Sequence, residues 1–95
     1  MNITEKGLKE LDFYKLQKSE KTIFYNPPIK YTRIEYKWDD GEMYEFDESP
    51  EIIIEKVIRQ EGDKKPQATW RFFGYKIKTI EQVKKIVELF GESWG

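Results

Sequence analysis

The stretch YTRIEYKWDDGEMYEFDE, residues 31–48, carries the clearest strand signal in the chain. Apolar and aromatic residues alternate with charged ones on both sides of its DDG sequence, which is the pattern of an antiparallel hairpin. A three-residue DDG loop sets Tyr36 across from Tyr44, whereas a two-residue loop would set Tyr36 across from Glu45. We therefore expect a three-residue loop with its glycine in the left-handed region, and an antiparallel sheet built on this hairpin.

The residues that precede this hairpin predict a short helix and two short strands. Thr4 suits an N-cap, and Ile3 and Leu8 have the spacing of a hydrophobic staple, so the helix should cover about two turns. Residues 13–17 and 21–25 are the two strand candidates, separated by a polar KSE sequence. The NPP sequence after them should end any strand, because proline cannot donate a backbone hydrogen bond.

Two further helices are predicted after the hairpin, and a glycine ends each of them. The first has Ser49 as its N-cap and Pro50 as its first helical residue. Its apolar stripe consists of Ile53, Ile54, Val57 and Ile58. The second begins with Thr79 and Gln82, which have the spacing of a capping box.

Residues 68–79, ATWRFFGYKIKT, are expected to form one strand that leads into the last helix. In a regular strand the core face is formed by Phe73, Tyr75 and Ile77. The other face then carries Trp70 and Phe72. A bulge at the glycine would shift the register and bury Trp70 or Phe72 instead, and the sequence leaves both arrangements open.

The resulting order is helix, four strands, helix, strand, helix. It predicts a small α+β fold with a mostly antiparallel sheet of four or five strands and two or three helices packed on one face. A chain of 95 residues has room for one hydrophobic core, so we expect a single domain over residues 1–95.

The composition excludes several kinds of chemistry. Without cysteine the chain has no disulfide, thiolate nucleophile or zinc–thiolate site, and without histidine it has no imidazole base or Ser-His-Asp triad. No apolar run is long enough to span a membrane, and the first residues lack the apolar core of a signal peptide. We therefore expect a cytoplasmic protein that is not an enzyme and that uses no cofactor, no metal and no membrane.

Charge is distributed unevenly, although the formal net charge is only −1. Residues 35–55 contain nine acidic residues and one basic residue, whereas residues 63–85 contain seven basic and two acidic residues. The acidic hairpin is a candidate surface for a host or defence protein with a basic surface, because complementary charge speeds association. Its candidate partner-binding residues are Asp39, Asp40, Glu42, Glu45, Asp47 and Glu48. Two alternatives stay open, a solvated hairpin tip and a divalent-metal loop, although the loop lacks the EF-hand spacing.

The stretch 68–79 offers a second candidate site, for a nucleotide or a single-stranded nucleic acid. An exposed ring beside basic side chains would stack on a base and neutralise a phosphate. The residues of this candidate are Trp70, Arg71, Phe72, Lys76 and Lys78. The alternatives are that both faces of the strand are covered, or that the rings form a hydrophobic protein interface.

The two ends of the chain resemble short accessory proteins encoded by phages of Gram-positive bacteria. The similarity lies in ITEKGLKELDFYKL, residues 3–16, and in YKIKTIEQVKKIVELFG, residues 75–91, about a third of the chain. The resemblance implies a phage or mobile-element protein, and many such small, cysteine-poor proteins act by binding a host or defence component. It implies no particular site residues.

These observations favour a non-enzymatic protein that inhibits or modulates a host or defence factor by direct binding, as anti-CRISPR-like, anti-defence inhibitors do. One alternative is a binder of nucleotides or single-stranded nucleic acid that acts as a sponge for a signalling nucleotide. Another is a structural subunit of a larger assembly. The sequence does not determine the oligomeric state.

Overall fold

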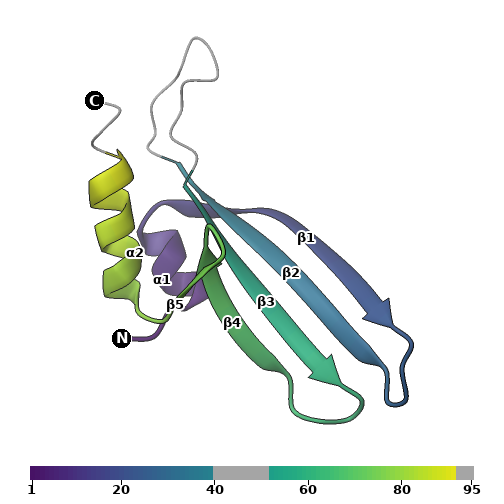
Figure 1. The fold of residues 1–95 in the computed structure, drawn as a ribbon. Coiled ribbons are helices and arrows are strands. Elements are labelled where there is room, and N and C mark those ends of the chain that lie inside the picture. Colours follow the sequence, from purple (N-terminus) through teal and green to yellow (C-terminus); the bar gives the residue numbers. More distant parts are fainter. Residues whose placement is uncertain (40–51, 92–95) are drawn as a thin grey trace.

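The protein is an α+β fold that consists mostly of antiparallel sheet, as the sequence predicted (Figure 1). The computed structural model describes residues 1–39 and 52–91. Within these ranges one five-stranded sheet has the order β1-β2-β3-β4-β5, so each strand lies beside its neighbour in the chain. The elements are α1 (Glu5–Glu10), β1 (Phe13–Ile23), β2 (Ile29–Trp38), β3 (Ile53–Glu61), β4 (Gln67–Phe72), β5 (Tyr75–Ile77), α2 (Ile80–Ile86) and a π-helical turn (Val87–Gly91).

β1 is one long strand, and not the two short strands that the sequence predicted. It pairs with β2 from Phe13 opposite Trp38 to Ile23 opposite Ile29, with one irregularity between Lys15 and Gln17. The polar KSE sequence does not interrupt it, because most of β1 is exposed and a polar side chain there costs no burial. The NPP sequence ends the strand, as predicted.

The pairing predicted for Tyr36 is wrong, because β1 and β3 occupy the two edges of β2. Tyr36 lies opposite Lys15 on one side and opposite Ile54 on the other. Of the predicted DDG loop, only Asp39 is described; Asp40, Gly41 and Tyr44 lie outside the described residues.

The helix predicted after Ser49 is also wrong, because Ile53–Glu61 is strand β3. The four apolar residues of the expected stripe fit either period, since adjacent pairs recur four positions apart. Pairing with β2 decides between them: Ile54 is fully buried opposite Tyr36, whereas Ile53 is half-buried on the other face. The β-branched side chains of this segment suit the pleated sheet.

Residues 68–79 form a hairpin, and not one strand. Phe73 and Gly74 have φ angles of 49° and 80°, and Phe72 lies opposite Tyr75, so the two strands are joined by a two-residue turn of type I′. The predicted core face is therefore wrong at two positions: Phe73 and Tyr75 are exposed, while Phe72 and Ile77 are buried. One of the two arrangements left open by the sequence, a bulge at Gly74, would bury Trp70 or Phe72. Phe72 is buried, but a complete reversal of the chain at Phe73 and Gly74 produces this burial.

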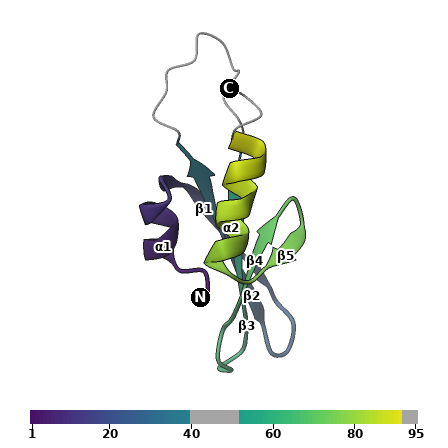
Figure 2. The same cartoon turned by 90° about the vertical axis from the view of Figure 1, so that its left-hand side faces the viewer.

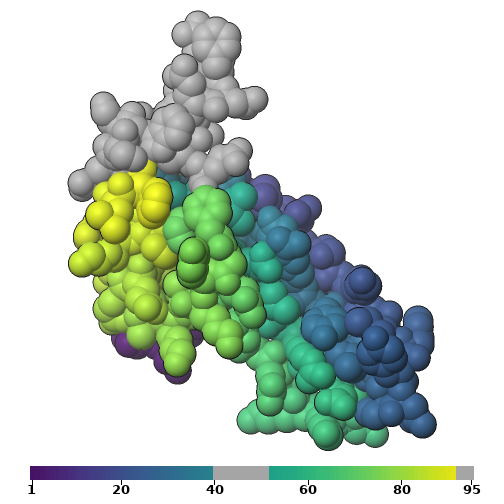
Figure 3. Space-filling view, in the orientation of Figure 1, coloured from purple at the N-terminus to yellow at the C-terminus, as the bar shows by residue number. Residues whose placement is uncertain are grey.

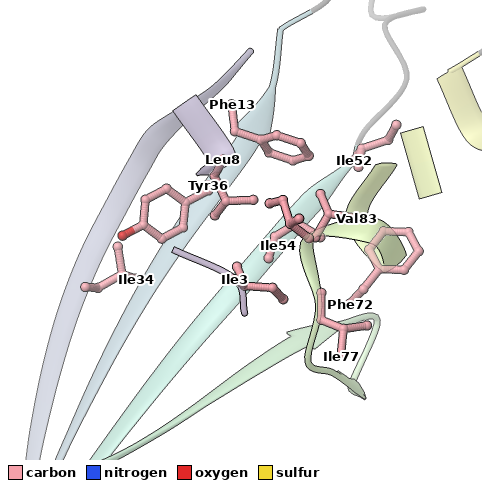
Figure 4. Close-up of a cluster of buried hydrophobic side chains, with 11 residues drawn as sticks. Ile3, Leu8, Phe13, Ile34, Tyr36, Ile52, Ile54, Phe72, Ile77 and Val83 are labelled. Atoms are coloured by element: carbon pink, nitrogen blue, oxygen red, sulfur yellow. The ribbon is translucent and has the colours of Figure 1, made fainter. Parts of the chain in front are cut away.

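The core joins both helices to the sheet (Figure 4). Its fully buried members are Leu8, Ile52, Ile54 and Val83, and Phe13, Tyr36, Phe72 and Ile77 surround them. The predicted caps hold the helices in place: the Thr4 hydroxyl accepts the Gly7 N–H at 3.0 Å, and Thr79 forms the capping box with Gln82. Capping is local, which is why both helix starts could be predicted.

The strands extend well beyond the helices (Figures 1 and 2). The ends of β1 and β2 that meet at the NPP turn, and the ends of β3 and β4 that meet near Gly62, lie away from both helices. Side chains in these distal ends, such as Lys18, Glu20 and Lys30, are exposed and joined by surface ion pairs. The core is therefore confined to one end of the sheet.

Candidate functional site

The acidic segment proposed for partner binding begins at Asp39, directly after β2, at the end of the sheet that packs against the helices. Asp39 donates its backbone N–H to the Asp12 carbonyl at 2.8 Å, and Trp38 donates to the Ile52 carbonyl at 2.9 Å. The second bond holds Trp38 beside Ile52, so the described residues that flank residues 40–51 lie next to each other, and the first ties Asp39 to the residue that precedes β1. We call residues 40–51 the acidic connection. The connection contains six acidic residues and no basic residue. The other predicted partner-binding residues, Asp40, Glu42, Glu45, Asp47 and Glu48, lie outside the described residues.

An exposed aromatic and aliphatic cluster lies at the same end of the sheet, and we call it the aromatic end. Its exposed members are Phe73, Tyr75, Leu89 and Phe90. Three of them adjoin the buried Phe72: its ring centroid is 4.6 Å from that of Phe73 and 5.5 Å from that of Phe90, and Tyr75 lies opposite it in the hairpin. Phe73 and Tyr75 belong to the β4–β5 hairpin, and Leu89 and Phe90 belong to the π-helical turn that continues α2. Figure 3 shows that this hairpin and the C-terminal helical segment lie side by side on the surface.

The aromatic end adjoins the strand ends from which the acidic connection departs. Phe72 lies opposite Ile54 in the sheet, and Ile54 is two residues after Ile52, the first described residue after the connection. On the other side, Gly91 lies so close to the Trp38 indole that an added Cβ would come within 2.8 Å of it. The exposed rings therefore lie at the same end of the sheet as the described residues Trp38, Asp39 and Ile52, which flank the acidic connection in the chain.

Phe73 combines exposure with an unfavourable backbone conformation. Its φ of 49° lies in the left-handed region, where a bulky side chain is unfavourable and asparagine or glycine is preferred. Its side chain is 73% exposed, so burial does not compensate for the strain. Phe73 is predicted from the sequence as a core residue, whereas a glycine directly after it, between two runs of alternating apolar residues, is a signal for a two-residue turn.

The second candidate is a pocket of about 420 Å³ at the edge of the sheet, which we call the β5-edge pocket. Its lining residues are Asn2, Ile3, Ala68, Thr69, Trp70, Lys76, Ile77 and Lys78. The fold thus brings together three of the residues predicted for nucleotide binding, Trp70, Lys76 and Lys78. Asn2 was not predicted, because only the tertiary structure brings the N-terminus to this edge, where Asn2 forms a bridge with Thr79.

The other two predicted nucleotide-binding residues lie elsewhere. Phe72 is buried in the core, and the Arg71 guanidinium donates from Nη1 to the Gly74 carbonyl at 3.1 Å, where it supports the turn. Trp70 is half-buried, with its ring centroid 5.6 Å from that of Tyr36 and the Lys56 ammonium 5.2 Å from the indole. The candidate is therefore reduced to Trp70 and two lysines.

The charge around the β5-edge pocket is positive. Neither Lys76 nor Lys78 forms an ion pair with a described residue. The nearby N-terminal amine lies 3.3 Å from the Glu81 carboxylate. The Glu81 backbone N–H at the start of α2 and this amine lower the pKa of the Glu81 carboxyl, which stays ionised and offsets the charge of the amine.

The face of the sheet that points away from the core carries a row of paired polar side chains. Gln17 donates to Glu35 at 2.7 Å, and Arg33 donates to Glu55 at 2.8 Å and lies 3.8 Å from Glu35. These cross-strand pairs satisfy one another, so their charges are less available for a ligand.

No described group of three or more His, Cys, Asp or Glu side chains is arranged to hold a metal ion. Within residues 1–39 and 52–91, no helix is long and apolar enough to cross a membrane. Comparisons of the chain with protein-family models, with curated proteins and with solved structures gave no match.

Proposed function

We propose that the protein is a non-enzymatic binding protein of a phage or mobile element that inhibits a host or defence protein by direct contact. The observation that carries the proposal is Phe73, a large exposed ring held at a positive φ angle. Strained residues that folding does not require are found at functional sites, because selection for function maintains them.

The aromatic end has the composition of an interface centre. Large rings bury much area at a low cost in conformational entropy, and they dominate the binding energy of protein interfaces. Phe73, Tyr75, Leu89 and Phe90 are exposed around a fixed ring, Phe72, so the surface is held in place before a partner arrives. Such preorganisation lowers the entropic cost of binding.

The acidic connection, with six acidic residues and no basic residue, predicts that the partner has a basic surface. A basic rim around an apolar socket would receive the rings at the centre and the carboxylates at the edge. We infer also that both helices cover one face of the sheet, an arrangement that their shared core supports. The paired polar face then stays outside the interface.

Affinity capture with matched variants tests the proposal. The tagged protein is incubated with lysate of a Gram-positive host, and retained proteins are quantified by mass spectrometry, then purified for binding measurements. Phe73→Asn should abolish retention of the specific partner, whereas Phe24→Asn should not, because Phe24 is an even more exposed ring but lies next to the NPP turn, away from the aromatic end. Loss of the partner with both variants, or with neither, would contradict the proposal.

The electrostatic part has its own test. Reversal of Asp39, Asp40 and Glu42 to Lys should slow association and weaken its dependence on salt between about 0.1 and about 0.5 M. Unchanged association rates and salt dependence would show that these acidic residues do not belong to the interface. The aromatic end would still be part of the proposed interface. If light scattering instead shows that the wild-type protein forms large homo-oligomers, a structural subunit is the better description.

A further inference from the structure

We propose that the β5-edge pocket binds a small nucleotide, with a base against Trp70 and its phosphates at Lys76 and Lys78. This inference does not rest on the proposed function, since the pocket and the aromatic end are formed by different residues. It assigns a ligand class to the one group of predicted residues that the fold assembles.

The size and lining of the pocket suit a ligand that is part ring and part anion. A volume of about 420 Å³ lies within the range of small-molecule sites. The apolar side is formed by Ile3, Trp70 and Ile77, and the polar side by Asn2 and the two lysines. No carboxylate belongs to the described lining, so nothing in it repels a phosphate.

The two lysines carry positive charge that no described carboxylate neutralises. Redirecting an unpaired ammonium group toward a ligand costs side-chain entropy but breaks no ion pair, whereas a paired one must also lose its partner. Lys76 and Lys78 are two residues apart and line the same pocket, which suits the one or two phosphate groups of a nucleotide.

The sheet edge offers main-chain groups for the edge of a base. β5 pairs with β4 only opposite Trp70, Arg71 and Phe72, so no described strand covers the outer edge of residues 67–69. Two residues of this uncovered segment, Ala68 and Thr69, line the pocket. Their backbone groups and the Asn2 amide are the donors and acceptors that would distinguish one base from another.

A mononucleotide or cyclic dinucleotide fits this geometry better than a nucleic-acid strand. Single-stranded nucleic acids bind along grooves with a succession of rings and basic residues. Here one ring and two lysines line a single pocket at the sheet edge, where the register sets Trp70 and Lys76 on opposite faces of the β4–β5 hairpin, so a ligand that contacts both must cross the edge. Asn2 and Ile3 bound the pocket on one side through the bridge to Thr79 and the bond from the Ile3 N–H to the Lys78 carbonyl.

Isothermal titration of the 95-residue chain tests the proposal, with AMP, ATP and a cyclic dinucleotide as probes. At least one should bind saturably, and Lys76→Ala and Lys78→Ala should each weaken it about tenfold, as expected for a lost charge-assisted bond. The matched control is Lys64→Ala with Lys65→Ala, a pair in the loop between β3 and β4 that lies outside the pocket, which should leave binding unchanged.

Trp70→Phe supplies a second measurement that does not depend on charge. This substitution keeps an aromatic ring in place, so it should weaken nucleotide binding by a smaller factor than either lysine variant does. It should leave the affinity for pyrophosphate unchanged, because pyrophosphate has no base. The proposal is overturned by the absence of saturable binding to any of the three nucleotides. It is also overturned if the lysine variants and the control variant lose equal affinity for the nucleotide, or if the wild-type protein binds pyrophosphate as tightly as the nucleotide. A higher affinity for an oligothymidine of about ten nucleotides than for any of the three nucleotides would likewise overturn it.

Discussion

At the scale of single residues, neighbouring isoleucines have different roles. Ile54 points into the centre of the core, where its side chain is fully buried, and Ile53 points to the opposite face and is half-buried. A helix would have placed both on one stripe. Single substitutions therefore report directly on the strand geometry.

Ile54→Ala should lower the free energy of unfolding by about 3 kcal/mol, because a fully buried isoleucine leaves a cavity. Ile53→Ala should lower it by about 1 kcal/mol, because much of that side chain already contacts water. Urea denaturation followed by circular dichroism measures both. Equal losses at the two positions would contradict their placement on opposite faces.

The buried phenol of Tyr36 predicts a loss of stability in alkali. Burial raises its pKa above the ordinary value of 10.0, and the nearby Glu5 carboxylate adds to this while Lys15 opposes it. A raised pKa in the folded state means that the stability present below pH 10.0 is lost as the pH rises through that pKa.

Tyr36→Phe should therefore reduce the fall in unfolding free energy between about pH 8 and about pH 11. Urea denaturation at the two pH values gives the difference for each protein. Tyr25→Phe is the control, since Tyr25 is exposed and should leave the fall unchanged. An equal fall in wild type and Tyr36→Phe would show that other groups cause it.

At the scale of elements, the β4–β5 turn does the most to determine the surface. Its two residues at positive φ reverse the chain, bury Phe72 and expose Phe73 and Tyr75. Gly74 has no atom within 4 Å of the position of an added Cβ. Substitution there consequently measures backbone strain and not crowding.

Gly74→Ala should lower the free energy of unfolding by about 1 kcal/mol, because alanine is unfavourable at a φ of 80°. Phe73→Asn should leave it unchanged or raise it by up to about 1 kcal/mol, since Asn-Gly is the preferred sequence of a type I′ turn. Thermal denaturation compares the two. A marked destabilisation by Phe73→Asn would mean that folding itself needs the ring.

At the scale of the whole molecule, stability should vary along the sheet. β2 and β3 are paired on both edges, and their inner ends carry the core residues Tyr36 and Ile54. The distal ends extend beyond the helices, as Figures 1 and 2 show.

Native-state hydrogen exchange should be slowest for the amides near Tyr36 and Ile54 and much faster in residues 18–23 of β1, which is an edge strand without core side chains in that part. Mass spectrometry of exchanged fragments can measure the contrast. Uniform protection along β1 would show that the distal half is held as firmly as the core.

Features that depend on near neighbours could be predicted from the residue pattern alone. These are the two helix starts at Thr4 and Thr79, the break at the NPP sequence, and the antiparallel α+β class, because caps and prolines act within three or four residues. That residues 53–61 form a strand could not be predicted in this way, since their apolar pattern fits both periods and pairing with β2 selects one.

The candidate sites divide in the same way. The sequence indicated aromatic and basic residues between positions 70 and 78, but their use depends on the turn at Phe73 and Gly74. That turn buries Phe72 and exposes Phe73, and the N-terminal bridge completes a pocket around Trp70 and the two lysines. Composition can therefore suggest a ligand class, whereas contacts between residues distant in the chain decide which side chains meet it.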